Sequence, residues 1–189
     1  IPVVLADEFS ADFHSIYFDD LKGAEMAVDY LAALDHSRIA FVNGDINSLH
    51  GQKRLEGVKK SFKKNNIIID QKLIKDGDFY VEDGYQSMQE IFELPQAKWP
   101  TAVFAASDNQ AIGVLQAVEE KGLKAPDDIA VIGYDNIELA KYLKLTTIWQ
   151  PMYQLGYLTI EVLLKAINGE LKDIYHKELE LKLVKRETA

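Results

Sequence analysis

Residues 101–133 read TAVFAASDNQAIGVLQAVEEKGLKAPDDIAVIG, and this stretch decides the fold. It contains an apolar run (101–107), a helical pattern (108–122) and a second apolar run (129–133). Ser107 is a natural N-cap for the helix, because its hydroxyl oxygen can accept a hydrogen bond from the first turn. Continuous apolar strands joined through a helix are typical of a parallel sheet that is covered on both faces.

The same alternation continues on both sides of this stretch. Apolar or alternating segments predict strands, and segments with apolar residues at helical spacing predict helices. The further strands that we expect are residues 2–6, 15–18, 38–44, 72–78, 145–151 and 177–186, and the further helices are residues 21–34, 51–65, 82–94 and 152–168. The pattern predicts an α/β fold with a doubly wound parallel sheet. In such a sheet, ligands bind outside the carboxyl ends of the strands.

The composition excludes several classes of protein. The 189 residues carry 30 acidic and 21 basic side chains, and the net charge of −9 has the wrong sign for gripping nucleic-acid phosphates. The absence of cysteine excludes disulfide scaffolds, thiolate zinc sites and cysteine nucleophiles. No apolar run approaches the roughly 20 residues that cross a bilayer. We therefore expect neither membrane insertion nor direct DNA binding by this chain.

Signatures of catalysis are also missing from the sequence. The chain has no G-x-G-x-x-G after a strand, no G-x-x-x-x-G-K-[ST] and no G-x-S-x-G, so dinucleotide, P-loop and serine-hydrolase chemistry find no support. The four histidines lack the H-x-x-x-H spacing of a metal site. We expect no enzyme activity, no cofactor and no metal, and the sequence favours binding over turnover.

Polar side chains follow the ends of the expected strands. They are Asp19, Asp20, Asn43 to Asp45, Asp78, Ser107, Asp108, Asp135 and Asn136. Phe79 is the exception, an aromatic residue among acids, and core packing is its alternative role. Arg54 lies one turn into the expected helix 51–65. An aromatic face beside carboxylates and an arginine suits a sugar or a planar ring.

Each of these residues also has an ordinary structural role. Capping of the next helix is the commoner role for Ser107 and Asp108. A position on the solvated surface is the default for Arg54, and a lone histidine such as His50 is seldom a ligand. For Asp135 the two interpretations stay open, because no convincing helix begins directly after it. The whole set is stronger evidence for a ligand-binding site than any single residue, since the predicted fold places all of them at the same edge of the sheet.

Five segments, taken together, resemble the effector-binding core of the lactose/galactose-repressor-type (LacI/GalR) transcription regulators. They are DDLKGAEMAVDYLAALDHSRIAFVNG (19–44), QKRLEGVKKSF (52–62), GDFYVEDGYQSMQEI (77–91), PTAVFAASDNQAIGVLQAVEEKGLKAPDDIAVIGYDN (100–136), and LTTIWQP (145–151) with the closing LVKRETA (183–189). One such segment alone would be a weak signal, but five in order are specific.

The resemblance implies a fold of the periplasmic-binding-protein type I, with two α/β lobes around a sugar or purine. Residues 19–145 and 169–189 would form an essentially complete C-terminal lobe. Residues 1–18 and 146–168 would form part of the N-terminal lobe. The helix-turn-helix DNA-binding domain of the family would be absent from this chain, which agrees with a start on a strand without a Met. A processed secreted protein is the other explanation of that start.

The resemblance also implies roles for particular residues. Arg54, Phe79 and Asp135 match the arginine, the stacking aromatic and the acid that contact the effector in this family. Ser107 and Asp108 match an Asn-Asp pair, with Ser107 standing where Asn is usual.

Three further positions complete the expected effector site. Asp19 matches the acid at the lobe boundary. Ser48 occupies a position where purine-responsive members carry a base-recognising arginine, which favours a sugar over a purine. His50 lies four residues before Arg54 and can share its side of the helix.

The expected function is the effector-binding domain of a cytoplasmic bacterial transcriptional repressor. The resemblance implies a homodimer, with helix 108–121 and segment 138–145 as the dimer surface, and operator DNA would be reached only through the absent domain. A core-facing stripe would explain the apolar residues of these two segments equally well. The alternative is a periplasmic sugar-binding protein of a transporter, which uses the same fold without binding DNA.

Overall fold

The computed structural model describes residues 1–189, which divide into two compact units. Unit 1 comprises residues 1–19 and 150–181, and unit 2 comprises residues 20–149 and 182–189. The sequence placed the divisions after residues 18, 145 and 168, so two of the three boundaries differ by several residues. These divisions come from the family resemblance, whereas in the structure residues 146–149 pair within the sheet of unit 2 and residues 176–179 within that of unit 1.

Unit 2 is built on a six-stranded sheet in the order β4-β3-β5-β6-β7-β9. All neighbouring strands are parallel except β7 and β9, which pair antiparallel. The strands are β3 (Ile39–Val42), β4 (Ile74–Lys75), β5 (Ala102–Ala105), β6 (Ala130–Asp135), β7 (Thr146–Trp149) and β9 (Lys182–Val184). The parallel α/β architecture that the sequence predicts is therefore confirmed.

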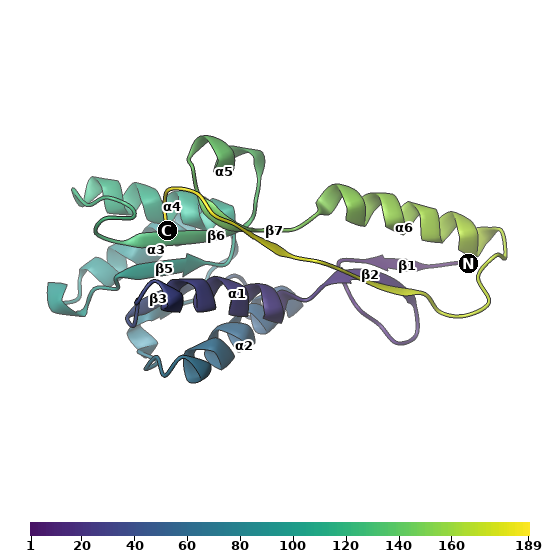
Figure 1. The fold of residues 1–189 in the computed structure, drawn as a ribbon, viewed down its shortest axis with the longest axis horizontal. Helices are drawn as coiled ribbons and strands as arrows, with labels where there is room; N and C mark the ends of the chain where they lie inside the picture. The colour runs from purple at the N-terminus through teal and green to yellow at the C-terminus, as the bar shows by residue number, and fades with distance from the viewer. The chain divides into compact units, whose positions relative to one another are not determined.

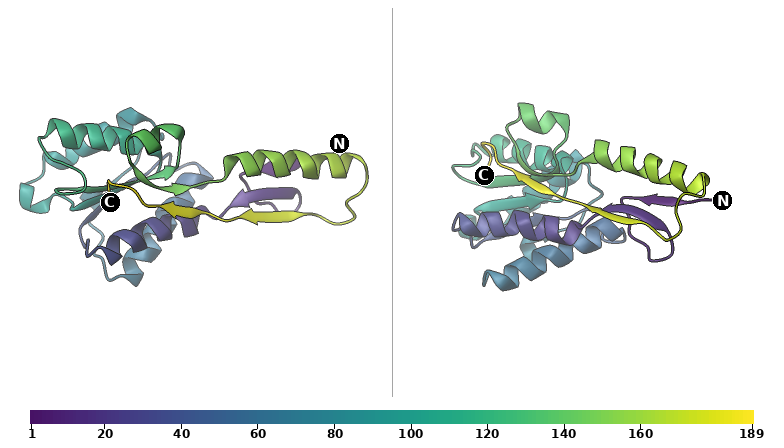
Figure 2. Two further views of the ribbon diagram at one scale, coloured as in Figure 1. Left: turned by 45° about the horizontal axis from the view of Figure 1, so that its top comes forward. Right: turned by 45° about the vertical axis from the view of Figure 1, so that its right-hand side comes forward.

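Helices cover both faces of this sheet, as Figures 1 and 2 show. Helix α1 packs against α2 on one face, and α3 packs against α4 on the other. The helices are α1 (Asp20–Ala33), α2 (Leu49–Lys64), α3 (Val81–Phe92), α4 (Asp108–Glu120) and the short α5 (Glu138–Tyr142), with single 3₁₀ turns at Gln71–Leu73 and Gln96–Lys98. Strands β3 and β5 are buried throughout, as expected for a sheet with two covered faces.

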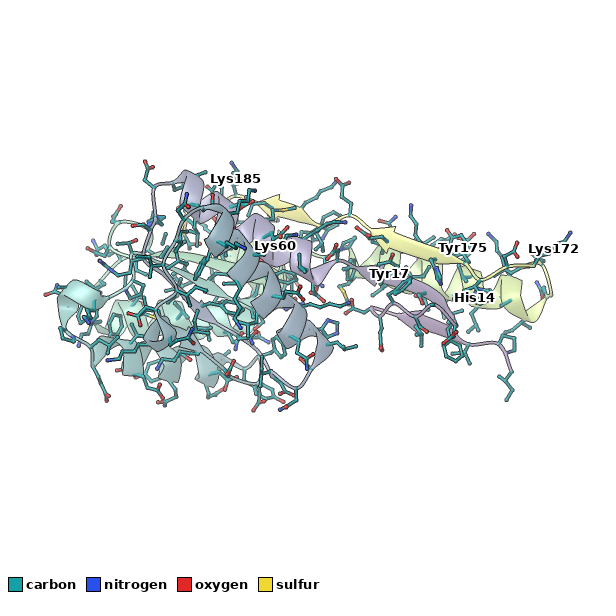
Figure 3. The ribbon with its side chains drawn as sticks, turned by 90° about the horizontal axis from the view of Figure 1, so that it is seen from below. His14, Tyr17, Lys60, Lys172, Tyr175 and Lys185 are labelled. Carbon is teal, nitrogen blue, oxygen red and sulfur yellow. The ribbon has the colours of Figure 1, made fainter.

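Unit 1 is a smaller layered unit. Its three parallel strands are ordered β1 (Val4–Ala6), β2 (His14–Phe18) and β8 (His176–Leu179), and α6 (Met152–Ile167) packs on β1 and β2. The backbone N–H of Tyr175 donates to Nδ1 of His14 at 2.9 Å, and both residues are labelled in Figure 3. None of the helices combines the length and the apolar character that spanning a membrane requires.

Two details differ from the sequence interpretation. The expected strand 177–186 is two strands, β8 in unit 1 and β9 in unit 2, which is why the boundary falls after residue 181. Leu179 and Leu181 are both buried, so the alternating pattern runs on through the break and conceals it. In addition, α5 begins at Glu138, shortly after Asp135, where the sequence shows no helical periodicity.

Candidate functional site

The carboxyl ends of β3, β5 and β6 lie along one edge of the sheet in unit 2. In the parallel register Val42 is paired with Ala105, and Phe104 with Ile132, so the segments that follow these strands emerge side by side. Those segments carry the aromatic, acidic and hydroxyl residues that the sequence singled out. The edge therefore brings together side chains that are far apart along the chain.

Arg54 is the centre of this edge. Its side chain is only 6% exposed, and its Nε and Nη2 lie 2.9 and 2.8 Å from Oδ1 of Asp20, the first residue of α1. Its Nη1 donates to the backbone carbonyl of Ala106, directly after β5. The default surface role for Arg54 is therefore wrong, because a partner from another helix compensates the buried charge.

Two aromatic rings flank the guanidinium group of Arg54. Its Cζ lies 3.8 Å from the ring centroid of Tyr134 and 5.6 Å from that of Phe79, both within the range of a cation–π contact. Tyr134 is fully buried in β6, and burial raises the pKa of its phenol well above the ordinary value. Tyr134 is not among the site residues predicted from the sequence, where shaping the turn after the strand is a sufficient role for it.

Asp20 links Arg54 to His50. Nδ1 of His50 lies 2.7 Å from Oδ2 of Asp20, while Arg54 occupies Oδ1. Burial alone would raise the pKa of Asp20, but the hydrogen bond from His50 and the charge of Arg54 outweigh it and keep the pKa below the ordinary value. His50 is thus joined to the site through Asp20, one of the strand-end acids, whereas the family resemblance matched its neighbour Asp19.

Phe79 is held in an unusual position. Its φ of 67° lies in the left-handed region, which is uncommon for a residue with a side chain. A Cβ on Gly44 would lie only 1.8 Å from Cζ of the Phe79 ring, so the ring rests on a glycine that leaves room for it. The hydroxyl of Ser107 donates to the backbone carbonyl of Phe79 at 3.1 Å. A fixed aromatic face is the result.

Ser107 and Asp108 are engaged with the protein itself. The hydroxyl of Ser107 accepts from the backbone N–H of Gln110 at 3.1 Å, as an N-cap of α4. The carboxylate of Asp108 is fully buried and accepts from the Thr147 hydroxyl at 2.6 Å and from the Ile137 N–H at 2.8 Å. Their structural roles are therefore established, and their predicted contact with the effector stays a prediction.

Asp135 ends β6 beside Arg54. Burial raises the pKa of Asp135 to about 7, although the positive charge of Arg54 opposes the shift. The nearby Asp108, whose own pKa burial raises to about 6, adds to the shift in Asp135. The backbone N–H of Asp108 hydrogen-bonds to the Asp135 carboxylate. A carboxyl group with such a pKa can accept or donate a hydrogen bond near neutral pH.

The two remaining candidates, Ser48 and Asp19, are described by their positions in the fold, and their predicted contact with the effector stays a prediction. Ser48 is the N-cap of α2, where its hydroxyl accepts from the Gly51 N–H at 3.0 Å and donates to the Asp45 carbonyl at 2.7 Å. Asp19 is the last residue of the first segment of unit 1, directly before α1. No group of three or more acidic or histidine side chains in the protein could hold a metal ion.

The residues at the carboxyl edge of the unit 2 sheet form the kind of site that binds a small molecule. A buried arginine between two aromatic rings, beside a partly buried acid, is suited to recognising a small polar molecule. Asp135 lies beside the arginine, and Asp20 pairs with it, so two acidic side chains accompany the guanidinium group.

Comparisons with known proteins agree with this class. Residues 28–189 match the periplasmic binding protein-like domain family. The chain is 37% identical over 173 residues to the HTH-type transcriptional repressor CytR of Escherichia coli (strain K12), covering 89% of this chain and 50% of CytR. It is 37% identical over 185 residues to the HTH-type transcriptional repressor PurR of Histophilus somni (strain 129Pt), covering 96% of this chain and 54% of PurR. The chain thus spans about half the length of these curated relatives.

Solved structures of transcriptional regulators are also similar to this chain. A regulatory protein of the LacI family from Chloroflexus aggregans superposes with a TM-score of 0.92 at 28% identity, covering 99% of this chain and 68% of that protein. A LacI family transcriptional regulator from Enterococcus faecium with bound ribose gives 0.87 at 30% identity, covering 99% and 70%. The transcriptional regulator CelR in its cellobiose complex gives 0.86 at 29% identity, covering 93% and 54%.

The chain belongs to the periplasmic binding protein-like domain family and is an effector-binding domain of the LacI type. The resemblance predicted from the five sequence segments is confirmed. The relatives are transcriptional regulators by name, which favours this interpretation over the transporter component.

Proposed function

We propose that the chain binds a small sugar-like effector as part of a cytoplasmic LacI-type repressor. Unit 2 would be the C-terminal lobe and unit 1 part of the N-terminal lobe. The repressor would bind operator DNA through a helix-turn-helix domain outside this chain. The observation that carries the proposal is the burial of Arg54 between Tyr134 and Phe79, next to Asp135.

Several features support a sugar as the effector. The face of Phe79 offers a surface for C–H groups, and Asp135 offers an acceptor for hydroxyls. Ser48 stands where the purine-responsive members carry arginine. Two similar structures contain ribose and cellobiose. Ser107 and Asp108 would act from the edge of the site, while Asp19, Ser48 and His50 would complete the set of contacts.

The mechanism would be a shift between conformations. A ligand moves such an equilibrium only by the difference between its affinities for the two states. Arg54 and Asp135 would supply that difference by contacting the ligand more closely in one of the two states than in the other. The proposed activity is therefore recognition without chemical conversion.

Calorimetric titration with pentoses, hexoses, disaccharides and nucleobases tests the proposal. We expect one of the sugars to bind and Phe79→Ala to weaken its binding at least tenfold, about 1.4 kcal/mol. Gly44→Ala should have a similar effect, since its Cβ would displace the Phe79 ring from a distance of 1.8 Å. Gly156→Ala is the matched control, because a Cβ there meets nothing within 4 Å. Undiminished sugar binding by both site variants, or binding of nucleobases alone, would contradict the proposal.

The proposed homodimer would use segment 138–145 more than helix α4. The apolar residues of α4 are mostly buried against α3 and the sheet, whereas Leu139, Tyr142 and Leu143 are 46%, 72% and 40% exposed. We expect Tyr142→Lys to raise the dimer dissociation constant at least tenfold in sedimentation equilibrium. Lys59→Glu on the exposed side of α2 is the control. A monomeric parent protein, or equal dissociation constants, would refute this surface.

A further inference from the structure

The closing segment of the chain is fixed to unit 2 at a point near the site. The Thr188 hydroxyl donates to the Val131 carbonyl of β6 at 2.7 Å and accepts from the Thr146 N–H of β7 at 2.9 Å. The N–H of Val131 in turn donates to the Thr188 carbonyl at 2.7 Å. Figure 1 shows this yellow end of the chain beside β6. The segment is therefore a defined part of the lobe and not a loose terminus.

Arg186 extends from this segment to the loop after β6. Its Nη2 donates to Oδ1 of Asn136 at 2.6 Å, and its Nη1 donates to the carbonyl of Leu145, directly before β7. Its backbone N–H donates to the Thr146 hydroxyl at 2.9 Å. One planar guanidinium group thus joins the closing segment, the start of β7 and the residue next to Asp135.

The loop that Arg186 reaches is strained. Asp135 and Asn136 have φ values of 107° and 58°, two consecutive residues with positive φ and no glycine between them. Such conformations are unfavourable for residues with a side chain and persist only where the surroundings enforce them. On one side the carboxylate of Asp108 accepts from the N–H of Ile137 at 2.8 Å. On the other side the guanidinium group of Arg186 holds the side chain of Asn136.

We propose that Arg186 is a positioning residue for ligand recognition. By bridging Oδ1 of Asn136 and the carbonyl of Leu145, it fixes the positive-φ backbone that aims the Asp135 carboxylate. Arg186 does not contact the ligand in this arrangement and acts only through Asn136. The part of the test that uses a ligand rests on the proposed function, and the part that uses hydrogen exchange does not.

Native-state hydrogen exchange measures how firmly the loop after β6 is held in its conformation. In Arg186→Met and in Asn136→Ala we expect the amide of Ile137 to exchange at least tenfold faster than in the parent protein. The amides of β5 serve as the internal reference and should keep their rates. The double variant should exchange no faster than Arg186→Met alone, because Asn136→Ala removes only a bond that Arg186→Met already removes. Equal acceleration of the β5 amides would show a merely structural role and overturn the proposal, as would additive effects.

Titration with ribose supplies the functional readout. We expect Arg186→Met to weaken ribose binding at least tenfold, and Arg186→Lys to weaken it less, since one ammonium group can replace one of the two side-chain hydrogen bonds. Glu187→Gln is the matched control, because it removes an exposed ion pair with Lys144 in the same segment. Unchanged ribose affinity in Arg186→Met would refute the proposal. If ribose fails to bind the parent protein, the choice of ligand fails, and the exchange measurements still decide the role of Arg186.

Discussion

Replacing Arg54 by alanine is expected to destabilise the protein by roughly 3–5 kcal/mol, the cost of leaving one member of a buried ion pair alone. The remaining member is Asp20, whose side chain is only 3% exposed and whose Oδ1 receives both Nε and Nη2 of Arg54. The substitution also removes the group that lies 3.8 Å from the Tyr134 ring. Ligand binding should weaken at least tenfold in addition.

Urea denaturation and sugar titration of the same samples measure the two effects of Arg54→Ala. Lys59→Ala is the matched control, a basic residue of the same helix that lies exposed and should change stability by less than about 0.5 kcal/mol. The double variant Asp20→Asn with Arg54→Met should recover part of the stability, because it removes both charges together. A loss of stability below about 1 kcal/mol for Arg54→Ala would show that the ion pair is not buried in solution.

The framework of unit 2 could be predicted from the sequence because it depends on local patterns. Apolar runs and helical spacing locate the strands and helices, and the carboxyl edge of a parallel sheet follows from their order. The division of 177–186 between two sheets could not be predicted, since Leu179 and Leu181 keep the alternation regular across the break. Helix α5 has five residues, too few to show a helical period.

The candidate site was predicted less completely than the fold, because it depends on contacts between residues that are far apart in the sequence. Arg54, Phe79 and Asp135 follow from the family resemblance, and the structure brings them to one edge. The burial of Arg54 depends on Asp20, which is 34 residues away and lies on another helix. Tyr134 lies beneath the guanidinium group, and only the fold shows that contact. Spacing along one chain contains no information about such partners.

Asp135→Asn is expected to stabilise the protein at alkaline pH while it weakens ligand binding. Burial raises the pKa of Asp135 to about 7 from the ordinary value of 3.8. Between these two values the folded protein holds a proton that the unfolded chain has released. The free energy of unfolding therefore falls as the pH rises from about 4 to about 7, and the whole deficit is present above that range.

The size of this gain follows from the pKa shift. One pKa unit corresponds to about 1.4 kcal/mol, so a shift of this size sets an upper bound near 4 kcal/mol. Asp108 titrates in the same range and shares the coupling, so we expect Asp135→Asn to gain roughly 1–3 kcal/mol at pH 8 and almost nothing at pH 4. Urea denaturation at both values measures the difference. Asp127→Asn, which removes an exposed carboxylate, is the control for the change in net charge.

Although Asp135→Asn should raise the stability of the protein at pH 8, it should lower the affinity for the ligand. The side-chain amide introduced by Asp135→Asn keeps one acceptor but lacks the charge that strengthens a hydrogen bond from a hydroxyl, so the affinity for a sugar should fall at least tenfold at pH 8. A residue that costs stability and improves binding is retained for function, because selection for folding alone would remove it. A variant that is less stable at pH 8 and binds as well as the parent would assign Asp135 to the scaffold of β6 and exclude it from recognition.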